Sequence, residues 1–162
     1  MPRTTQFAIA IYLGAVLVST IYFLVKLWPT GGQQTIPLDI RLLLIAPLAG
    51  ALGAYVHLAT SFADYAGNER LTASWTWWYV FRPFIGMALA EIVYLAIRGG
   101  FFSAEAAGTP NAINPYGIAA VAALTGLFSR QATDKLREVF ETLFRTEHEV
   151  ERKDALPPDH IM

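Results

Sequence analysis

The sequence contains no cysteine, and only 15% of its residues are charged. Without cysteine, the chain has no disulfide framework, thiolate metal site, thiol nucleophile or c-type haem attachment. The net charge of −1 provides no basic stripe to displace counterions, so nucleic acid is not an expected partner. The G-x-S-x-G, H-E-x-x-H and phosphate-loop motifs are also absent. We therefore predict no catalytic, cofactor-binding or metal-binding residues and do not expect an enzyme.

Apolar residues, in contrast, are abundant. Of the 162 residues, 54% are hydrophobic, which is too many for an ordinary water-soluble domain. The predicted fold is all-α, a four-helix transmembrane bundle with a C-terminal amphipathic cytoplasmic helix. We expect a transmembrane domain over 1–129, an amphipathic helix over 130–146 and a disordered tail over 147–162. The predicted spans are residues 7–28, 41–63, 79–98 and 112–128.

Small residues recur at every fourth position in two of the predicted spans. They are Ala46, Gly50 and Ala54 in the second span, and Gly86 and Ala90 in the third. This small-xxx-small spacing lets helix backbones approach closely. The spacing indicates a docking groove, although generic filling by small residues explains it equally well.

Aromatic residues are clustered just before the third span, in the sequence WTWWY of residues 75–79. Amphipathic rings of this kind gather at the headgroup level, so we predict an interfacial anchor rather than an aromatic ligand site. Proline suits the first turn of a helix. Pro83 therefore predicts that the deep helix starts near Arg82, with the Trp-rich piece bent onto the membrane surface.

A carboxylate, Glu91, lies near the middle of the third span. An ionisable group at this depth costs about 2.5–3.5 kcal/mol on insertion scales unless it faces protein or water. If the second and third spans are antiparallel with Asp64 level with Arg82, residues whose numbers sum to about 146 face one another. This register predicts an inner-rim ion pair of Asp64 with Arg82 and an intramembrane polar pair of His57 with Glu91. The second pair is either a structural clamp between helices or a proton or cation site.

The fourth predicted span is short and rich in small residues. Its 17 residues cover roughly 25 Å, which is less than a typical hydrocarbon core. A lipid-facing helix would gain from large side chains, so this one is expected inside an assembly. The residues assigned to helix packing or to the lining of a pore are Ala119, Ala122, Ala123 and Gly126.

An apolar stripe runs along the C-terminal helix at the spacing of one helix face. Its residues are Leu136, Val139, Phe140, Leu143 and Phe144. The charges around the stripe nearly cancel, which disfavours simple attraction to anionic lipid. We expect the stripe to dock on a partner protein or on equivalent helices of neighbouring protomers, with docking on the underside of its own bundle as the alternative.

Lys and Arg are unequally divided between the two sides of a four-span chain. Nine fall on the side of the termini and three on the other side. The positive-inside rule then predicts a multi-pass protein of the cell inner (plasma) membrane with both termini in the cytoplasm. A three-span chain, in which the fourth segment does not cross, would place the termini on opposite sides.

Two strings, SWTWWYVFRPFIGMALA and GLFSRQATDKLREVFETLF, together with a GNERL loop, resemble a family of small uncharacterised bacterial multi-span inner-membrane proteins. The resemblance covers residues 50–144 and implies no activity and no site residues. A small-residue span leading into an amphipathic helix is also similar in plan to the pore-lining element of small-conductance mechanosensitive channels. That similarity covers about thirty residues, and the large soluble domain of those channels is absent.

Three functions fit these patterns. The leading hypothesis is a homo-oligomer whose fourth span lies near the axis of a pore for ions or small solutes. The alternative is a non-catalytic membrane anchor or adaptor whose C-terminal helix recruits a cytoplasmic protein. An intramembrane proton relay or enzyme comes third. In each case the lipid bilayer surrounds the bundle, no cofactor is expected, and the chain is expected to self-associate.

Overall fold

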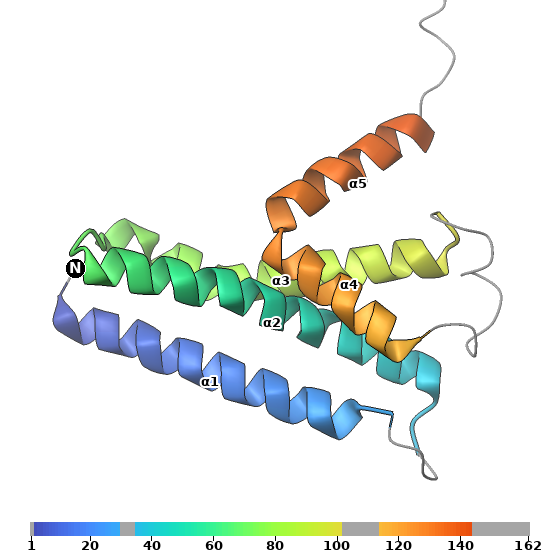
Figure 1. The fold of residues 1–162 in the computed structure, drawn as a ribbon, viewed down its shortest axis with the longest axis horizontal. Coiled ribbons are helices and arrows are strands. Elements are labelled where there is room, and N and C mark those ends of the chain that lie inside the picture. The colour runs from blue at the N-terminus through green and yellow to red at the C-terminus, as the bar shows by residue number, and fades with distance from the viewer. Residues whose placement is uncertain (1, 30–34, 102–113, 144–162) are drawn as a thin grey trace, which may run out of the picture.

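The computed structural model describes residues 2–29, 35–101 and 114–143, and these residues form helices and no strands, as the sequence predicted. In these ranges five α-helices follow one another, with a 3₁₀ helix before the third (Figure 1). Their bounds are α1 (Arg3–Leu27), α2 (Leu38–Gly67), η1 (Ala73–Trp75), α3 (Thr76–Arg98), α4 (Pro115–Leu127) and α5 (Ser129–Leu143).

Three of these elements have the length and apolar composition of membrane spans: α1, α2 and the combined η1 and α3 segment. The outer surface of α1 carries large apolar side chains, with Phe7, Ile11 and Val25 between 69% and 72% exposed. Apolar surface of this extent is unfavourable in water and favourable in lipid. The described helices therefore indicate a small multi-pass membrane protein.

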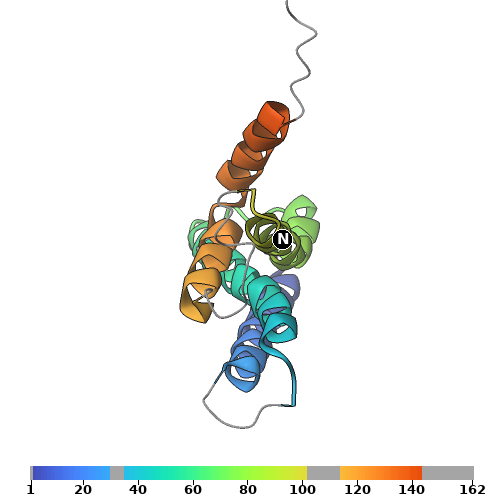
Figure 2. The same ribbon diagram turned by 90° about the vertical axis from the view of Figure 1, so that its right-hand side faces the viewer.

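The central element of the bundle is α2. It contacts α1, α3 and α4, and the view along the bundle places α1 on one side of α2 and α3 and α4 on the other (Figure 2). Two clusters of buried apolar residues surround it. One joins α2 to α3 and α4 and contains Leu42, Ala46, Ala49, Ala90, Tyr94, Ile118 and Ala122. The other joins α1, α2 and α3 at the opposite end and contains Ile9, Leu13, Leu58, Leu71 and Tyr79.

The small residues of α2 and α3 form the docking groove that their spacing predicted. A Cβ atom added to Gly50 would collide with the Cβ of Ala90 and the carbonyl oxygen of Gly86. A Cβ added to Gly86 would lie 2.6 Å from the Cβ of Ala54. The two backbones are therefore in direct contact, and only glycine fits at positions 50 and 86.

The same part of α2 also receives α4. A Cβ on Gly126 would collide with the backbone of Gly50, and a Cβ on Gly53 would collide with the carbonyl of Ala123. Gly50 therefore lies between the backbones of α3 and α4. The three helices meet near the middle of α2, at a point where none of them has room for a side chain.

The fourth predicted span is shorter than expected. α4 contains 13 residues, which rise about 20 Å, whereas a hydrocarbon core is about 30 Å thick. Its C-terminal residues pack against Gly50 and Gly53, close to the midpoint of α2. A complete fourth crossing is therefore not confirmed, and residues 112 and 113 of the predicted span lie outside the described residues.

The start of α3 corrects a second expectation. The helix begins at Thr76 and includes all of the Trp-rich piece except Trp75, which ends η1, so Pro83 lies inside α3 and not in its first turn. Ring contacts with α2 hold this piece in line with the rest of α3. Trp75 stacks on Tyr65 with ring centroids 6.2 Å apart, and Tyr79 meets Phe62 edge-on at 5.7 Å. These contacts with the protein replace the predicted bend onto the membrane surface.

The last described helix, α5, projects away from the bundle (Figures 1 and 2). Its main contacts are with α3 and α4. Leu136 and Val139 are half-buried, and Phe140 is 60% exposed. Docking of the stripe along the underside of the bundle is therefore not observed. Phe144 and the predicted disordered tail lie outside the described residues, and Leu143 is the last described residue of the helix.

Candidate functional site

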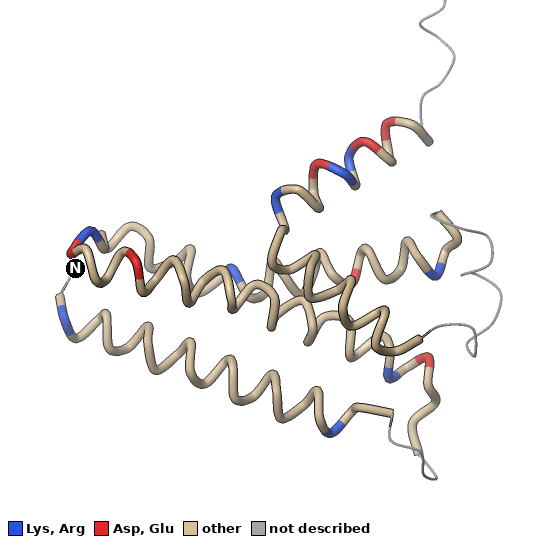
Figure 3. The backbone as a smooth tube through the Cα atoms, viewed as in Figure 1, with Lys and Arg blue, Asp and Glu red and all other residues tan. Residues whose placement is uncertain are grey.

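The predicted ion pair between Asp64 and Arg82 is not formed. Asp64 is exposed near the end of α2, and no hydrogen bond or ion pair joins it to Arg82 among the described residues. Few charged residues lie between the ends of the described bundle, whereas α5 carries several (Figure 3). Arg82 is therefore a half-buried cation without an acidic partner in the described part of the chain.

His57 and Glu91 are not brought together either. The exposed His57 ring lies edge-on to Trp78, with ring centroids 6.0 Å apart. Atom Oε2 of Glu91 is buried and has no hydrogen-bond partner among the described residues. No described contact supports the predicted pair as either a clamp or a proton site.

The helix register explains why both pairs are missing. The observed contacts Gly50–Gly86, Asp39–Arg98 and Ala54–Gly86 join residues whose numbers sum to 136, 137 and 140. The predicted register, with a sum near 146, is displaced by six to ten residues, or about 9–15 Å along the helix axis. The displacement follows from the start of α3 at Thr76, because the sequence-based register took Arg82 as the first deep residue.

One ion pair that the sequence analysis missed joins the other ends of these two helices. Arg98 Nη2 lies 3.0 Å from Asp39 Oδ1, with side chains 24% and 46% exposed. Asp39 is in the first turn of α2 and Arg98 is in the last turn of α3, so each charge also opposes the partial charge of its own helix end. This complementarity to the helix dipoles was the available signal in the sequence.

Arg41 is a second basic residue whose role appears only in the structure. It is 6% exposed, its Nε donates to the carbonyl oxygen of Leu27 at 2.9 Å, and its Nη2 donates to that of Trp28. The last carbonyl groups of a helix receive no hydrogen bond from within the helix, and they carry partial negative charge. Arg41 therefore caps α1 from α2 and fixes the distance between the two helices.

The small residues of α4 lie on its packed face. Ala122 is 2% exposed, Ala119 and Ala123 pack against the buried cluster, and Gly126 contacts Gly50. The opposite face carries large exposed apolar side chains, namely Tyr116, Val121, Leu124 and, just beyond the helix, Phe128. The four residues that the sequence assigned to packing or to a pore are thus in contact with the same chain.

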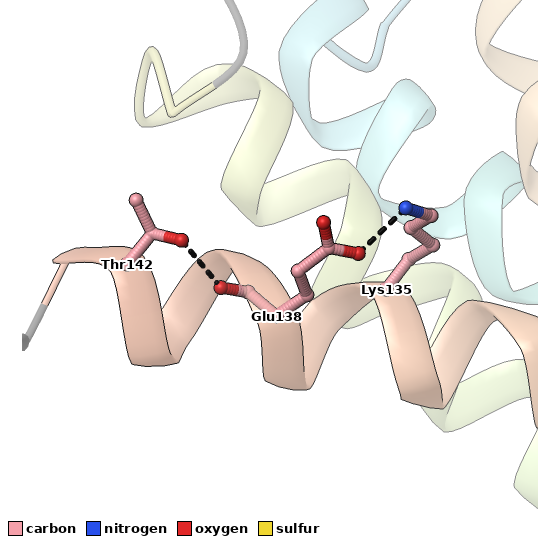
Figure 4. Close-up of polar contacts among 3 residues, drawn as sticks. All are labelled: Lys135, Glu138 and Thr142. Carbon is pink, nitrogen blue, oxygen red and sulfur yellow. Dashed lines mark hydrogen bonds and ion pairs between the residues drawn. The ribbon is translucent and has the colours of Figure 1, made fainter.

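Four charged residues of α5 form ion pairs along the helix itself, and Figure 4 shows the pair of Lys135 with Glu138. Lys135 Nζ lies 2.6 Å from Glu138 Oε2, and Arg137 Nε lies 2.7 Å from Glu141 Oε1. The hydrogen bond to Glu141 raises the pKa of Arg137 above its usual value. Exposed pairs of this kind contribute little to stability, because water and salt screen their attraction. These pairs balance the charges of α5 from Lys135 to Glu141.

A cleft of about 690 Å³ lies where α5 leaves the bundle. Its walls come from α2, α3 and the α4–α5 junction. The polar or charged lining residues are His57, Arg82, Ser129, Arg130, Gln131, Thr133 and Asp134, and the apolar or aromatic ones are Trp78, Ile85, Leu89, Leu127 and Phe128. His57 and Arg82 were both predicted site residues, but their predicted partners, Glu91 and Asp64, are not among the lining residues of this cleft.

Two buried polar atoms on lining residues of this cleft have no hydrogen-bond partner in the described structure. They are Nε of Arg82 and the hydroxyl oxygen of Ser129, a residue that is 2% exposed. The Arg82 guanidinium also lies 5.9 Å from the centroid of the Trp78 ring, which holds it at the wall of the cleft. Unpartnered buried donors are unfavourable, so this arrangement is suited to accepting a ligand.

Backbone donors add to this set. The first backbone hydrogen bond of α5 runs from the amide of Ala132 to the carbonyl oxygen of Phe128, at 2.9 Å. The amides of Ser129, Arg130 and Gln131 precede it, and none has an acceptor among the described hydrogen bonds. They are the orphan donors expected at the start of a helix, where the helix dipole also favours negative charge.

The described residues contain no group of three or more His, Cys, Asp or Glu side chains that could hold a metal ion. The residues that line the cleft therefore include hydrogen-bond donors, two arginines and one acidic residue, Asp134. Comparison of the chain with protein-family models, with curated proteins and with solved structures finds no match.

Proposed function

We propose that this protein is a non-catalytic membrane anchor whose α5 helix recruits a cytoplasmic protein. The observation that carries the proposal is the position of α5, which projects from the bundle and contacts mainly α3 and α4 (Figure 1). Leu136 and Val139 keep part of their apolar surface uncovered on this projecting helix. An amphipathic helix of this kind can dock into a groove of a partner protein.

The route of the chain supports a cytoplasmic position for α5. Ser129 lines the same cleft as Trp78 and Arg82, and Arg82 is only the seventh residue of α3, about 9 Å from its first. Tryptophans gather at the headgroup level, so this end of α3 marks the membrane interface. We infer that α4 completes a short crossing here, with local thinning of the bilayer compensating for its length.

The competing pore function receives less support. Its main argument was the small-residue face of α4, and Ala122 and Gly126 on that face pack against the same chain. The exposed face of α4 carries Val121 and Leu124, which do not favour a hydrated path. An oligomer with a pore along α4 would have to place these large apolar side chains at its axis.

The test uses full-length protein with a photo-crosslinking residue at position 136, in native membranes for capture and in nanodiscs for binding of the purified partner. We expect one protein to be captured in native membranes, and the purified partner to bind in a 1:1 complex. Val139→Asp should weaken this binding at least tenfold, because a charge would be buried in the apolar contact. The matched control is Thr142→Asp, which places the same charge off the stripe and should leave binding unchanged.

Three results would contradict the proposal. One is cross-linking only between copies of this chain, which would assign α5 to self-association. Another is ion flux through liposomes containing the purified protein, with the flux unaffected by Val139→Asp. Equal loss of binding with Val139→Asp and Thr142→Asp would also contradict a specific docking stripe.

A further inference from the structure

The cleft at the base of α5 concentrates hydrogen-bond donors that nothing in the described structure satisfies. Arg82 and Ser129 contribute unpartnered buried atoms, and the first three residues of α5 contribute free amides. Arg130 lines the same space. Donors outnumber acceptors here, so the complementary ligand group is one that accepts several hydrogen bonds at once.

The positive charge of the residues that line the cleft also favours an anionic ligand. Arg82 and Arg130 are cationic, and Asp134 is the one acidic residue in the lining. Asp134 is exposed, whereas Arg82 is half-buried and held against Trp78. A helix N-terminus together with guanidinium groups is the common protein environment for phosphate, whose oxygens accept hydrogen bonds from both.

The remaining wall of the cleft is apolar. Ile85 and Leu89 continue along α3 beyond Arg82, and Leu127 and Phe128 line the opposite side. The basic group thus lies about one turn away from an apolar surface on the same helix. This arrangement matches an amphiphile whose charged group meets Arg82 while its apolar part runs along α3.

We propose that this cleft binds a phosphate group, carried by the headgroup of an anionic phospholipid. Arg82 and the hydroxyl of Ser129 bind the phosphate oxygens together with the amides at the start of α5. Ile85 and Leu89 contact the first carbons of the acyl chain. The site is separate from the apolar stripe that carries the proposed partner docking, so either proposal can fail without the other.

The experiment measures ligand binding to delipidated full-length protein in detergent by native mass spectrometry and by the thermal unfolding shift. The ligands are phosphatidylglycerol, phosphatidylcholine and inorganic phosphate. We expect phosphatidylglycerol to bind at least tenfold more tightly than phosphatidylcholine. Inorganic phosphate at millimolar concentration should compete, because it presents the same oxygens without the acyl chains. If inorganic phosphate raises the unfolding temperature and phosphatidylglycerol does not, the natural ligand is a phosphate in solution, and the lipid assignment is overturned.

Variants distinguish a built site from general attraction to anionic lipid. Arg82→Gln should weaken phosphatidylglycerol binding about tenfold, and Ser129→Ala should weaken it severalfold while leaving the unliganded protein as stable as before or more stable. The matched control is Arg70→Gln, which removes an exposed charge outside the cleft and should change binding less than twofold. Equal effects of Arg82→Gln and Arg70→Gln would show that only surface charge attracts the lipid. If the Arg82→Gln variant does not fold, the Ser129→Ala variant is the test. Phosphatidylglycerol binding by that variant equal to native binding would contradict the proposal.

Discussion

Gly50 of α2 and Gly126 of α4 lie backbone against backbone, so close that a Cβ on Gly126 would overlap the Gly50 carbonyl. Gly50 meets Gly86 of α3 on another side. Three helices thus converge on one residue that has no side chain. Because lipid supplies no hydrophobic force between helices, van der Waals contact at such points is a main source of their association.

We predict that Gly126→Ala destabilises the protein. Overpacking of this kind costs about 1–3 kcal/mol, because the added methyl group has to displace backbone and not a mobile side chain. The measurement is thermal unfolding of the purified protein in detergent. Gly14→Ala is the control, since a Cβ at Gly14 has no neighbour within 4 Å and should leave the melting temperature unchanged or slightly raised. Equal melting temperatures for the two variants would refute the three-helix contact.

Arg41 should not be replaceable by lysine. Its Nε and Nη2 atoms reach the carbonyls of Leu27 and Trp28 together, and a single ammonium group cannot reproduce this two-pronged geometry. Arg41→Lys is expected to lose about 1.5 kcal/mol and Arg41→Ala up to about 3 kcal/mol. The measurement is the change in unfolding free energy of each variant in detergent, by denaturant or by heat. A lysine variant as stable as the native protein would show that charge alone suffices there.

The pair of Asp39 and Arg98 is expected to contribute modestly. Both side chains are partly exposed, so solvent screens their attraction, and pairs of this kind contribute about 0.2–1 kcal/mol. A double-mutant cycle with Asp39→Asn and Arg98→Gln isolates the coupling. Raising the salt concentration should reduce it. Zero coupling at low salt would indicate that the ends of α2 and α3 are not in contact.

Glu91 and His57 should behave independently. The structure separates them by register, so the double-mutant cycle of Glu91→Gln and His57→Ala should give a coupling energy near zero, below about 0.5 kcal/mol. Glu91→Gln alone should leave the protein as stable as before or more stable, because it removes a charge from a buried oxygen without a partner in the described structure. A coupling energy above about 1 kcal/mol would show that Glu91 and His57 interact, as the sequence-based register predicted.

The sequence predicted the elements more reliably than their mutual placement. The ends of α1 and α2 fall within a few residues of the predicted spans, because about twenty consecutive apolar residues signal a span. The spacing of Gly50, Gly86 and Ala90 indicated the groove but left generic filling as an equal alternative, and the backbone contacts favour the groove. The polar pairs failed because a six-residue difference in the start of α3 moves its side chains by about 9 Å relative to α2.

The cleft at the base of α5 was beyond the reach of sequence analysis for a related reason. Its lining comes from four segments, and only the angle between α4 and α5 brings Ser129 to Arg82. Hydropathy and periodicity are properties of neighbouring residues along one chain. They carry no information on the direction in which a helix continues after a break such as that at Phe128.

The sequence by itself therefore determined that this protein is helical and that its long apolar helices suit lipid, and it indicated that small residues could join two of them. These conclusions depend on local composition and spacing. The tertiary structure alone decided which residues are level with one another, that Arg41 caps α1, and that Arg82 and Ser129 share a cleft. Such relationships depend on backbone contacts between distant segments, and in this bundle those contacts are set at Gly50, where α2, α3 and α4 meet.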